Sequence, residues 1–361
     1  MRTYFWTGAI LALASAASAQ QAADAVAPEA GTIGAEFAGL ALSDVASASL
    51  AARNAGEVVL ADDWMVAAAN PLAVEAGARI LRDGGTAADA MVAVQTVLGL
   101  VEPQSSGLGG GAFLVYYDAS TGALSTLDGR ETAPLAATPR LFQDQNGEPL
   151  GFYDAVVGGR SVGTPGTPAL LEAAHRKWGK ANWGGLFTDA IRLAELGFAV
   201  SPRMAGSIAN DAERLGRFPA TADYFLPEGK PLEAGTVITN QPYADVLRAM
   251  AFEGTSAFYT GPVAADIVRT VQNAAGNPGV LSEVDLALYQ VKERPAVCAS
   301  YRAFEACGMG PPSSGALTVG QILGMLGQYD LAALGAESPE SWRLIGDASR
   351  LAFADRGRYM A

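Results

Sequence analysis

The run Ser105-Ser106-Gly107-Leu108-Gly109-Gly110-Gly111 opens a pattern that closes with Asp128-Gly129-Arg130-Glu131-Thr132-Ala133-Pro134. Between the two runs, residues 112–117 and 123–127 have the composition of strands, and residues 119–122 that of a turn. The stretch therefore predicts a glycine corner, a hairpin and then a buried arginine. Guanidinium groups bind carboxylates through two parallel hydrogen bonds. We interpret Arg130, with Glu131 beside it, as a candidate carboxylate-binding site.

Each part of this pattern has a plainer interpretation. Arg130 taken alone fits a surface ion pair, because Glu131 is its neighbour. The glycine run is compatible with a phosphate-binding loop, but it lacks the Gly-Lys-Ser/Thr ending and precedes a strand rather than a helix. A tight packing corner is the interpretation that the glycines favour.

The segments before the glycine run predict a strand and two helices. Residues 65–69 have the pattern of a buried strand. Asn70 is suited to cap a helix that has Pro71 in its first turn and ends at Asp83. A second helix is expected from Thr86, with Thr86 and Asp89 in a capping-box arrangement. Its apolar face, at helical spacing, consists of Ala90, Val94, Val97 and Val101.

Further helices are expected along the rest of the chain, at residues 169–178, 187–196, 243–252, 262–275, 316–326 and 339–353. Helices that alternate with strands indicate a layered α/β fold. We find neither repeats nor a clear linker, so we expect one continuous folded region.

Composition narrows the class of protein. The chain has 361 residues, 50% of them hydrophobic, and a net charge of −13. Such a chain is expected to be globular, and its acidity argues against binding nucleic acid or anionic membranes. Two cysteines and one histidine argue against a zinc site, so we expect no metal and no cofactor. His175, beside Arg176 and Lys177, is expected on a solvated helix face.

The first residues have the features of an export signal. Arg2 precedes the apolar residues 7–17, and Ala17-Ser18-Ala19 fits a cleavage site. We therefore expect a signal peptide at 1–19, a weakly structured extension at 20–60, a folded region at 61–361, and a periplasmic or secreted protein without a membrane span after cleavage. A membrane anchor or a merely alanine-rich start are the alternatives.

Cys298 and Cys307 lie in a segment, 295–309, that has the pattern of strand, turn and strand. The midpoint between them falls at Arg302-Ala303, where a hairpin would turn. The two cysteines would then face each other, and an oxidising compartment would let them form a disulfide. The alternative is two small core residues.

Several runs, in order, resemble the large-subunit portion of the γ-glutamyltranspeptidases (glutathione hydrolases). They span most of the chain: 69–73, 84–94, 107–113, 128–134, 163–166, 311–315 and 352–358. The resemblance implies an N-terminal-nucleophile hydrolase fold, an αββα sandwich that is incomplete in this chain. It also implies a precursor that cleaves itself into a large and a small subunit.

The resemblance assigns Arg130 to the α-carboxylate of a γ-glutamyl substrate, such as glutathione, with Glu131 orienting the arginine or supporting the pocket. It gives the loop 311–315 a structural role. The nucleophile is the first threonine of the small subunit, which would lie beyond Ala361. We therefore expect no catalytic nucleophile in these residues, and no activity from them without the small subunit. The acyl group would pass to water, amino acids or peptides.

Two other functions stay open from the sequence. A β-lactam acylase of the same fold would also bind a carboxylate if its acyl group were of the glutaryl type. An exported binding protein could keep this fold and lack catalysis.

Overall fold

The computed structural model describes residues 40–360, so the expected signal peptide and the first part of the extension lie outside the described residues. The described chain forms two compact units. We call residues 40–108, 133–164 and 178–288 the helical unit, and residues 109–132, 165–177 and 289–360 the sheet unit. Each is considered by itself.

The helical unit is built almost entirely of helices. They are α2 (Asp44–Asn54), α3 (Pro71–Arg82), α4 (Ala87–Val101), α5 (Phe152–Val156), η1 (Trp183–Phe187), α7 (Thr188–Leu196), α8 (Pro202–Leu215), α9 (Pro219–Phe225), η2 (Pro227–Gly229), α10 (Gln241–Glu253), α11 (Ser256–Tyr259), α12 (Gly261–Gln272) and α13 (Glu283–Ala287). Two short strands, β3 (Phe198–Ala199) and β4 (Val237–Ile238), pair antiparallel.

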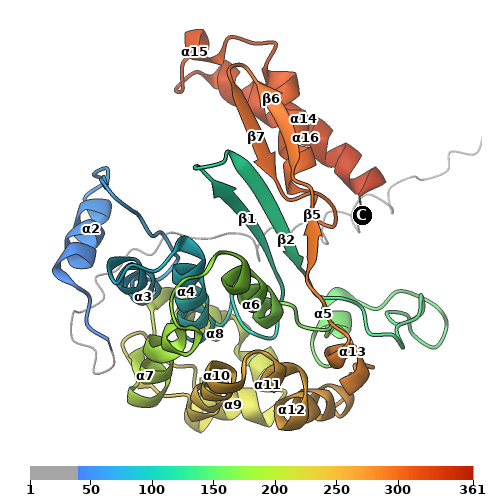
Figure 1. Cartoon of the computed structure of the whole chain (residues 1–361). Helices are drawn as coiled ribbons and strands as arrows, with labels where there is room; N and C mark the ends of the chain where they lie inside the picture. The colour runs from blue at the N-terminus through green and yellow to red at the C-terminus, as the bar shows by residue number, and fades with distance from the viewer. Residues whose placement is uncertain (1–39, 361) are drawn as a thin grey trace, which may run out of the picture. The chain divides into compact units, whose positions relative to one another are not determined.

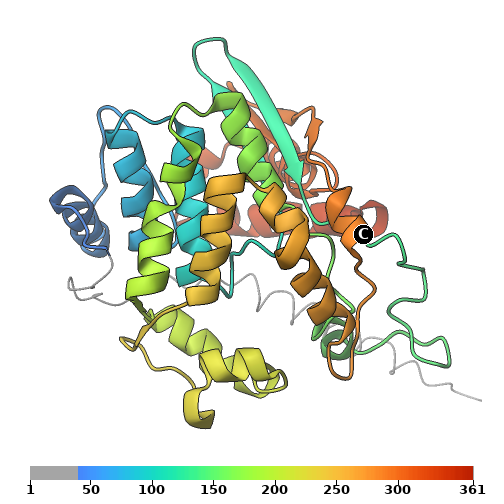
Figure 2. The same cartoon turned by 60° about the horizontal axis from the view of Figure 1, so that its bottom comes forward.

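Helices α3, α4, α7 and α10 pack side by side and hold the core of this unit (Figures 1 and 2). Their facing side chains are fully buried, among them Val97, Leu193, Leu247 and Met250. The expected helix starts are confirmed. The Asn70 side chain accepts a hydrogen bond from the Leu72 N–H at 3.0 Å, and Thr86 with Asp89 forms a reciprocal capping box.

Two segments before α3 differ from the sequence-based expectation. Residues 65–69 form no strand, and Met65 is 57% exposed, so the prediction of a buried strand is wrong. A strand needs a hydrogen-bonding neighbour, and no strand of the described chain pairs with this segment. Within residues 20–60, α2 forms a helix, because Ser43 caps it and the buried Glu75 accepts hydrogen bonds from the Ser43 N–H and hydroxyl.

The sheet unit contains the predicted hairpin. Strands β1 (Ala112–Asp118), β2 (Ala123–Gly129) and β5 (Lys292–Arg294) form one antiparallel sheet in the order β1-β2-β5 (Figure 1). The register pairs Phe113 with Asp128, and Thr126 with Arg294. The remaining elements are α6 (Thr167–Trp178, whose last residue is counted with the helical unit), β6 (Val297–Tyr301), β7 (Phe304–Gly308), α14 (Gly315–Leu326), α15 (Leu331–Leu334) and α16 (Pro339–Tyr359).

Strands β6 and β7 form a hairpin of their own, and α14 packs against both strands and against α16. Arg302 makes the turn with a φ of 55°. Cys298 lies directly across from Cys307, and their sulfur atoms form a disulfide bond. Both cysteines are exposed, so they are not residues of a core.

The described residues include no helix both long enough and apolar enough to cross a membrane. The described chain combines helices with antiparallel strands, which agrees with the expected α/β fold class.

Candidate functional site

Arg130 follows the last residue of β2, and other side chains hold its main chain on both sides. The Arg130 N–H donates to Asp128 Oδ1 at 3.0 Å. The Tyr289 hydroxyl donates to the Arg130 carbonyl oxygen at 2.8 Å. Asp128 is buried, and its other oxygen, Oδ2, accepts a hydrogen bond from Arg294 Nε at 2.7 Å. The peptide groups at Arg130 are therefore fixed by three residues from two strands and the segment before β5.

The side chain of Arg130 is exposed, and the expectation of a buried arginine is wrong. The strand ends one residue earlier, so the side chain leaves the sheet rather than pointing into a core. Its Nη1 donates to the Pro312 carbonyl oxygen at 3.4 Å, and its Cζ lies 5.9 Å from the centre of the Phe113 ring. Within the described part of the sheet unit, no carboxylate forms an ion pair with this guanidinium. An anionic ligand can therefore approach it without first displacing a carboxylate of the described sheet unit.

Glu131 is also exposed, and it lies close to the last glycine of the tract. A Cβ atom at Gly111 would come within 2.6 Å of Glu131 Oε2, 2.7 Å of the Glu131 nitrogen and 2.9 Å of Arg130 Cα. The main chain of residues 130–131 thus approaches the glycine too closely for any side chain. This is the packing corner that the tract predicts, and it adjoins the candidate site.

The loop that contains Pro312 is also held in the sheet unit. Ser313 N–H donates to the Gly310 carbonyl oxygen at 2.9 Å, and Arg356 Nε on α16 donates to Ser314 Oγ at 2.8 Å. Because Arg130 contacts Pro312, and Arg356 contacts Ser314, three segments that lie far apart in the sequence meet within the sheet unit: 128–132, 311–315 and 352–358.

Sequence reasoning did not identify Tyr289 or Arg294. Neither lies in a recognisable motif, and the three-residue strand β5 is too short to give a periodic signal. Burial raises the pKa of the Tyr289 hydroxyl to about 12, and the negative charges of Asp128 and Glu131 add to this effect. The hydroxyl therefore stays protonated, as a hydrogen-bond donor, at neutral pH.

Among the described residues, His175 and the two cysteines do not form a nucleophile–base pair. His175 lies on α6 and is half-buried rather than fully solvated. Cys298, Glu305 and Cys307 are grouped closely enough to suggest metal ligands. The two sulfur atoms are bonded to each other, however, so neither provides the thiolate that a metal would require.

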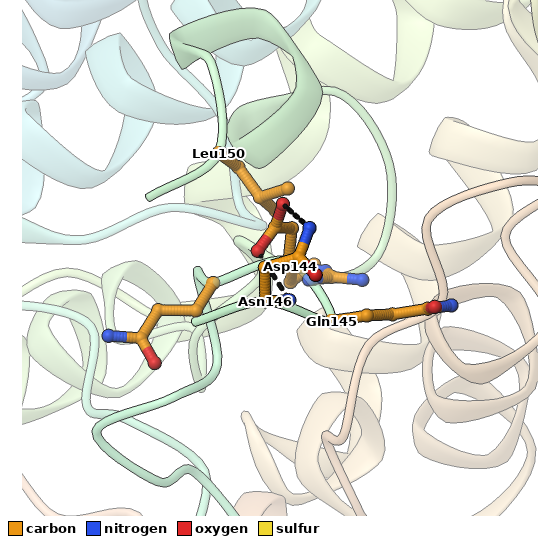
Figure 3. Close-up of a pocket in the computed structure, with 6 residues that line it drawn as sticks. Asp144, Gln145, Asn146 and Leu150 are labelled. Atoms are coloured by element: carbon orange, nitrogen blue, oxygen red, sulfur yellow. Dashed lines mark hydrogen bonds between the residues drawn. The ribbon is translucent and has the colours of Figure 1, made fainter. Parts of the chain in front are cut away.

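A hollow of about 500 Å³ lies in the helical unit and contains neither Arg130 nor Glu131 (Figure 3). Its lining residues are Gln143, Asp144, Gln145, Asn146, Leu150 and Arg160. The Asp144 carboxylate already accepts hydrogen bonds from the Asn146 and Glu148 N–H groups, and the Gln145 side chain points away from Asp144. These contacts are typical of a polar turn, so we assign the hollow no catalytic role.

The chain matches the family model of gamma-glutamyltranspeptidase over residues 73–361. This range includes the Arg130 region, the loop 311–315 and α16. The chain belongs to the γ-glutamyltranspeptidase family. The resemblance drawn from the sequence runs is thereby confirmed, together with the expectation of an enzyme family.

Named relatives and solved structures agree with this assignment. The chain is 38% identical over 303 residues to the glutathione hydrolase proenzyme of Bacillus subtilis (strain 168), covering 84% of the chain and 51% of that protein. It is 35% identical over 297 residues to the acylase ACY 1 proenzyme of Pseudomonas sp. (strain SE83), covering 81% and 52%. The chain thus spans about half the length of these curated relatives.

Among solved structures, the γ-glutamyltranspeptidase of Helicobacter pylori is similar in fold, with a TM-score of 0.80 and 34% identity. The likeness covers 84% of this chain and 86% of that one. The expected N-terminal-nucleophile hydrolase fold is confirmed by this likeness.

Proposed function

We propose that this chain is the large-subunit part of an enzyme that cleaves γ-glutamyl amides such as glutathione. The γ-glutamyl group passes to water, an amino acid or a peptide. One observation carries the proposal: Arg130 presents an exposed guanidinium without a carboxylate partner in the described part of its unit, on a main chain held by Asp128 and Tyr289. The relatives named as glutathione hydrolase proenzymes support the substrate class.

In this proposal the nucleophile is the N-terminal threonine of a small subunit made from the same precursor, as the family resemblance implies. The threonine oxygen attacks the γ-amide carbon, the threonine α-amino group takes the hydroxyl proton, and the amine product leaves with that proton. Water or an acceptor amine then attacks the resulting ester and releases glutamate or a new γ-glutamyl amide. The proposal therefore predicts no turnover by the 361 residues without that small subunit.

Arg130 contributes by binding the far end of the acyl group. Two hydrogen bonds to the α-carboxylate would fix both its position and its orientation. The γ-carbonyl carbon at the other end of the glutamyl chain is then held where the threonine attacks. In this proposal Glu131, which lies against Gly111, supports the binding site beside the arginine.

A glutaryl-type acylase is the second candidate, because the acylase ACY 1 proenzyme is 35% identical to this chain. A glutaryl group keeps a terminal carboxylate for Arg130 but lacks the α-amino group of glutamate. Cleavage rates for γ-glutamyl and glutaryl anilides separate the two functions. A γ-glutamyltranspeptidase cleaves the γ-glutamyl anilide faster, whereas an acylase cleaves the glutaryl anilide faster.

The decisive experiment replaces Arg130 by lysine in the enzyme assembled with its small subunit. Lysine keeps the charge but loses the planar pair of donors. We expect the loss of about 2–4 kcal/mol of transition-state stabilisation, or roughly 30- to 1000-fold in kcat/KM on a γ-glutamyl anilide. Self-cleavage of the precursor should continue. Equal kcat/KM for the wild type and Arg130→Lys would show that Arg130 does not bind the carboxylate.

We also propose export to the periplasm or the medium. The proposal rests on the charge and apolar pattern of residues 1–19, which precede the described part of the chain. Amino-terminal sequencing of the mature protein tests it, with Gln20 as the expected first residue.

A further inference from the structure

We propose that Asp128, Tyr289 and Arg294 are positioning residues for substrate binding. They fix the peptide groups on either side of the Arg130 Cα, and so determine where its guanidinium can meet a carboxylate. This inference rests on the proposed role of Arg130. It assigns a task to side chains that do not themselves touch the substrate.

Asp128 holds the amino side of Arg130. Its carboxylate is buried and has two partners, one on each oxygen: the Arg130 N–H at 3.0 Å and Arg294 Nε at 2.7 Å. Asp128 and Arg294 form an ion pair, and an ionised acceptor forms a stronger hydrogen bond to an N–H group than a neutral one.

Arg294 is itself held in place through the sheet. Its carbonyl oxygen accepts a hydrogen bond from Thr126 Oγ1 at 2.5 Å, and Thr126 and Arg294 are direct partners in the β2–β5 ladder. The hydrogen bonds that Arg294 forms with Thr126 and Asp128 therefore hold the end of β2 against β5. Through Asp128, these contacts also restrict the main chain of Arg130, the first residue after β2.

Tyr289 holds the carbonyl side of Arg130, through its hydroxyl at 2.8 Å. The ring has a close-fitting place, because a Cβ atom at Gly166 would lie 2.2 Å from the Tyr289 hydroxyl oxygen and 2.0 Å from the Gly129 carbonyl oxygen. Since burial keeps the pKa of this hydroxyl near 12, the hydrogen bond persists across the pH range in which enzymes of this kind are assayed.

None of these contacts uses the guanidinium of Arg130. Within the described residues, the side chain of Arg130 contacts the Pro312 carbonyl oxygen at 3.4 Å and lies 5.9 Å from the centre of the Phe113 ring. Removing the Tyr289 hydroxyl therefore leaves the charge in place and loosens the main chain that carries it. A bidentate contact is sensitive to such loosening, because both hydrogen bonds need the correct orientation at once. A substrate without the carboxylate is not sensitive to it.

The test compares two donors in the enzyme assembled with its small subunit. One is a γ-glutamyl anilide, and the other is the 4-aminobutyryl anilide, which differs only in lacking the α-carboxylate. The ratio of their kcat/KM values measures the preference for a carboxylate. For Tyr289→Phe we expect this preference to fall by about 5- to 50-fold, mainly through a higher KM for the γ-glutamyl donor. The 4-aminobutyryl donor should change by less than about twofold.

Tyr117→Phe is the matched control. Tyr117 is 64% exposed on β1 of the same sheet and is not part of the site. The Tyr117→Phe variant should therefore show the same preference for the carboxylate donor as the wild type. Asp128→Asn is the second variant. It keeps an acceptor for the Arg130 N–H but loses the charge that Arg294 pairs with, and it should lower the preference in the same direction.

The outcomes separate this inference from the proposed function. Equal losses on both donors, or full preference retained in both Tyr289→Phe and Asp128→Asn while Arg130→Lys loses it, overturn the positioning role and leave the role of Arg130 intact. Preference retained in Arg130→Lys overturns the role of Arg130 and the positioning role with it. If Tyr289→Phe fails to undergo self-cleavage or melts early, Asp128→Asn decides on the same criteria.

Discussion

At the scale of single residues, the candidate site depends on glycines that leave no room for a Cβ atom. Gly111 and Gly109 belong to the same tract, but their surroundings differ. A Cβ atom at Gly111 would meet main-chain atoms of residues 130–131 at 2.7–2.9 Å, whereas one at Gly109 would meet nothing within 4 Å. Main-chain atoms cannot turn away as the end of a side chain can, so the two glycines are not equivalent.

We therefore predict that Gly111→Ala lowers kcat/KM on a γ-glutamyl anilide by about 10-fold or more, because Arg130 and Glu131 must shift. Gly109→Ala should stay within about twofold of the wild type. Steady-state kinetics of the two variants, in the enzyme assembled with its small subunit, measure the difference. Matching values for both would mean that the close approach at Gly111 has no bearing on the site.

At the scale of elements, Asp89 joins the start of α4 to a distant loop. Its buried carboxylate accepts hydrogen bonds from the Thr86 N–H at 2.8 Å, the Lys180 N–H at 2.9 Å and the Ala181 N–H at 3.1 Å. Burial by itself would raise the pKa of Asp89, but these hydrogen bonds outweigh it and lower the pKa below its ordinary value. One side chain thus acts both as a helix cap and as an anchor for residues 180–181.

We predict that Asp89→Asn lowers the free energy of unfolding by about 2–4 kcal/mol at pH 7, because an amide cannot accept all of these hydrogen bonds. A carboxyl group with a lowered folded-state pKa stabilises the fold above its unfolded pKa, about 3.9, and loses this effect as the pH falls through the folded value. The difference between variant and wild type should therefore shrink on acidification below about pH 4.

Urea unfolding of the assembled enzyme at pH 7 and in acid measures this difference. Asp266→Asn is the control, since the Asp266 side chain is 63% exposed and forms an ion pair with Arg269 on the same helix. We expect a change of less than about 0.5 kcal/mol. A difference for Asp89→Asn that is the same at both pH values would contradict the ionic contribution of this carboxylate.

At the scale of the whole molecule, the chain spans about half the length of its curated relatives. In the sheet unit, α16 exposes large apolar side chains, with Trp342 64%, Leu351 61% and Phe353 58% exposed. Exposed apolar surface of this kind is unusual in a protein that functions alone. It is consistent with the proposed small-subunit partner.

We predict that the 361-residue chain by itself binds a hydrophobic dye and self-associates, and that a small subunit supplied in solution reduces both. Dye fluorescence and size-exclusion chromatography provide the measurements. A monomer that binds no dye and melts in one sharp transition would indicate that the chain is a self-sufficient domain.

Some of this protein is determined by local sequence. Helix caps at Asn70 and Thr86, the β1–β2 hairpin and the turn at Arg302 were all predictable, because each depends on residues within a few positions of one another. The ordered runs predicted the family for a similar reason, since they can be read without knowing which of them meet in space.

Only the tertiary structure decided the exposure of Arg130 and the contacts that hold it. Tyr289 is 159 positions from Arg130, and Pro312 is 182 positions away, so no local pattern could place either beside it. The same reason explains the wrong prediction at residues 65–69, where the composition suited a strand but no partner pairs with it in the described chain. Local propensity chooses among backbone conformations, whereas strand pairing, burial and a binding site depend on segments that only folding brings together.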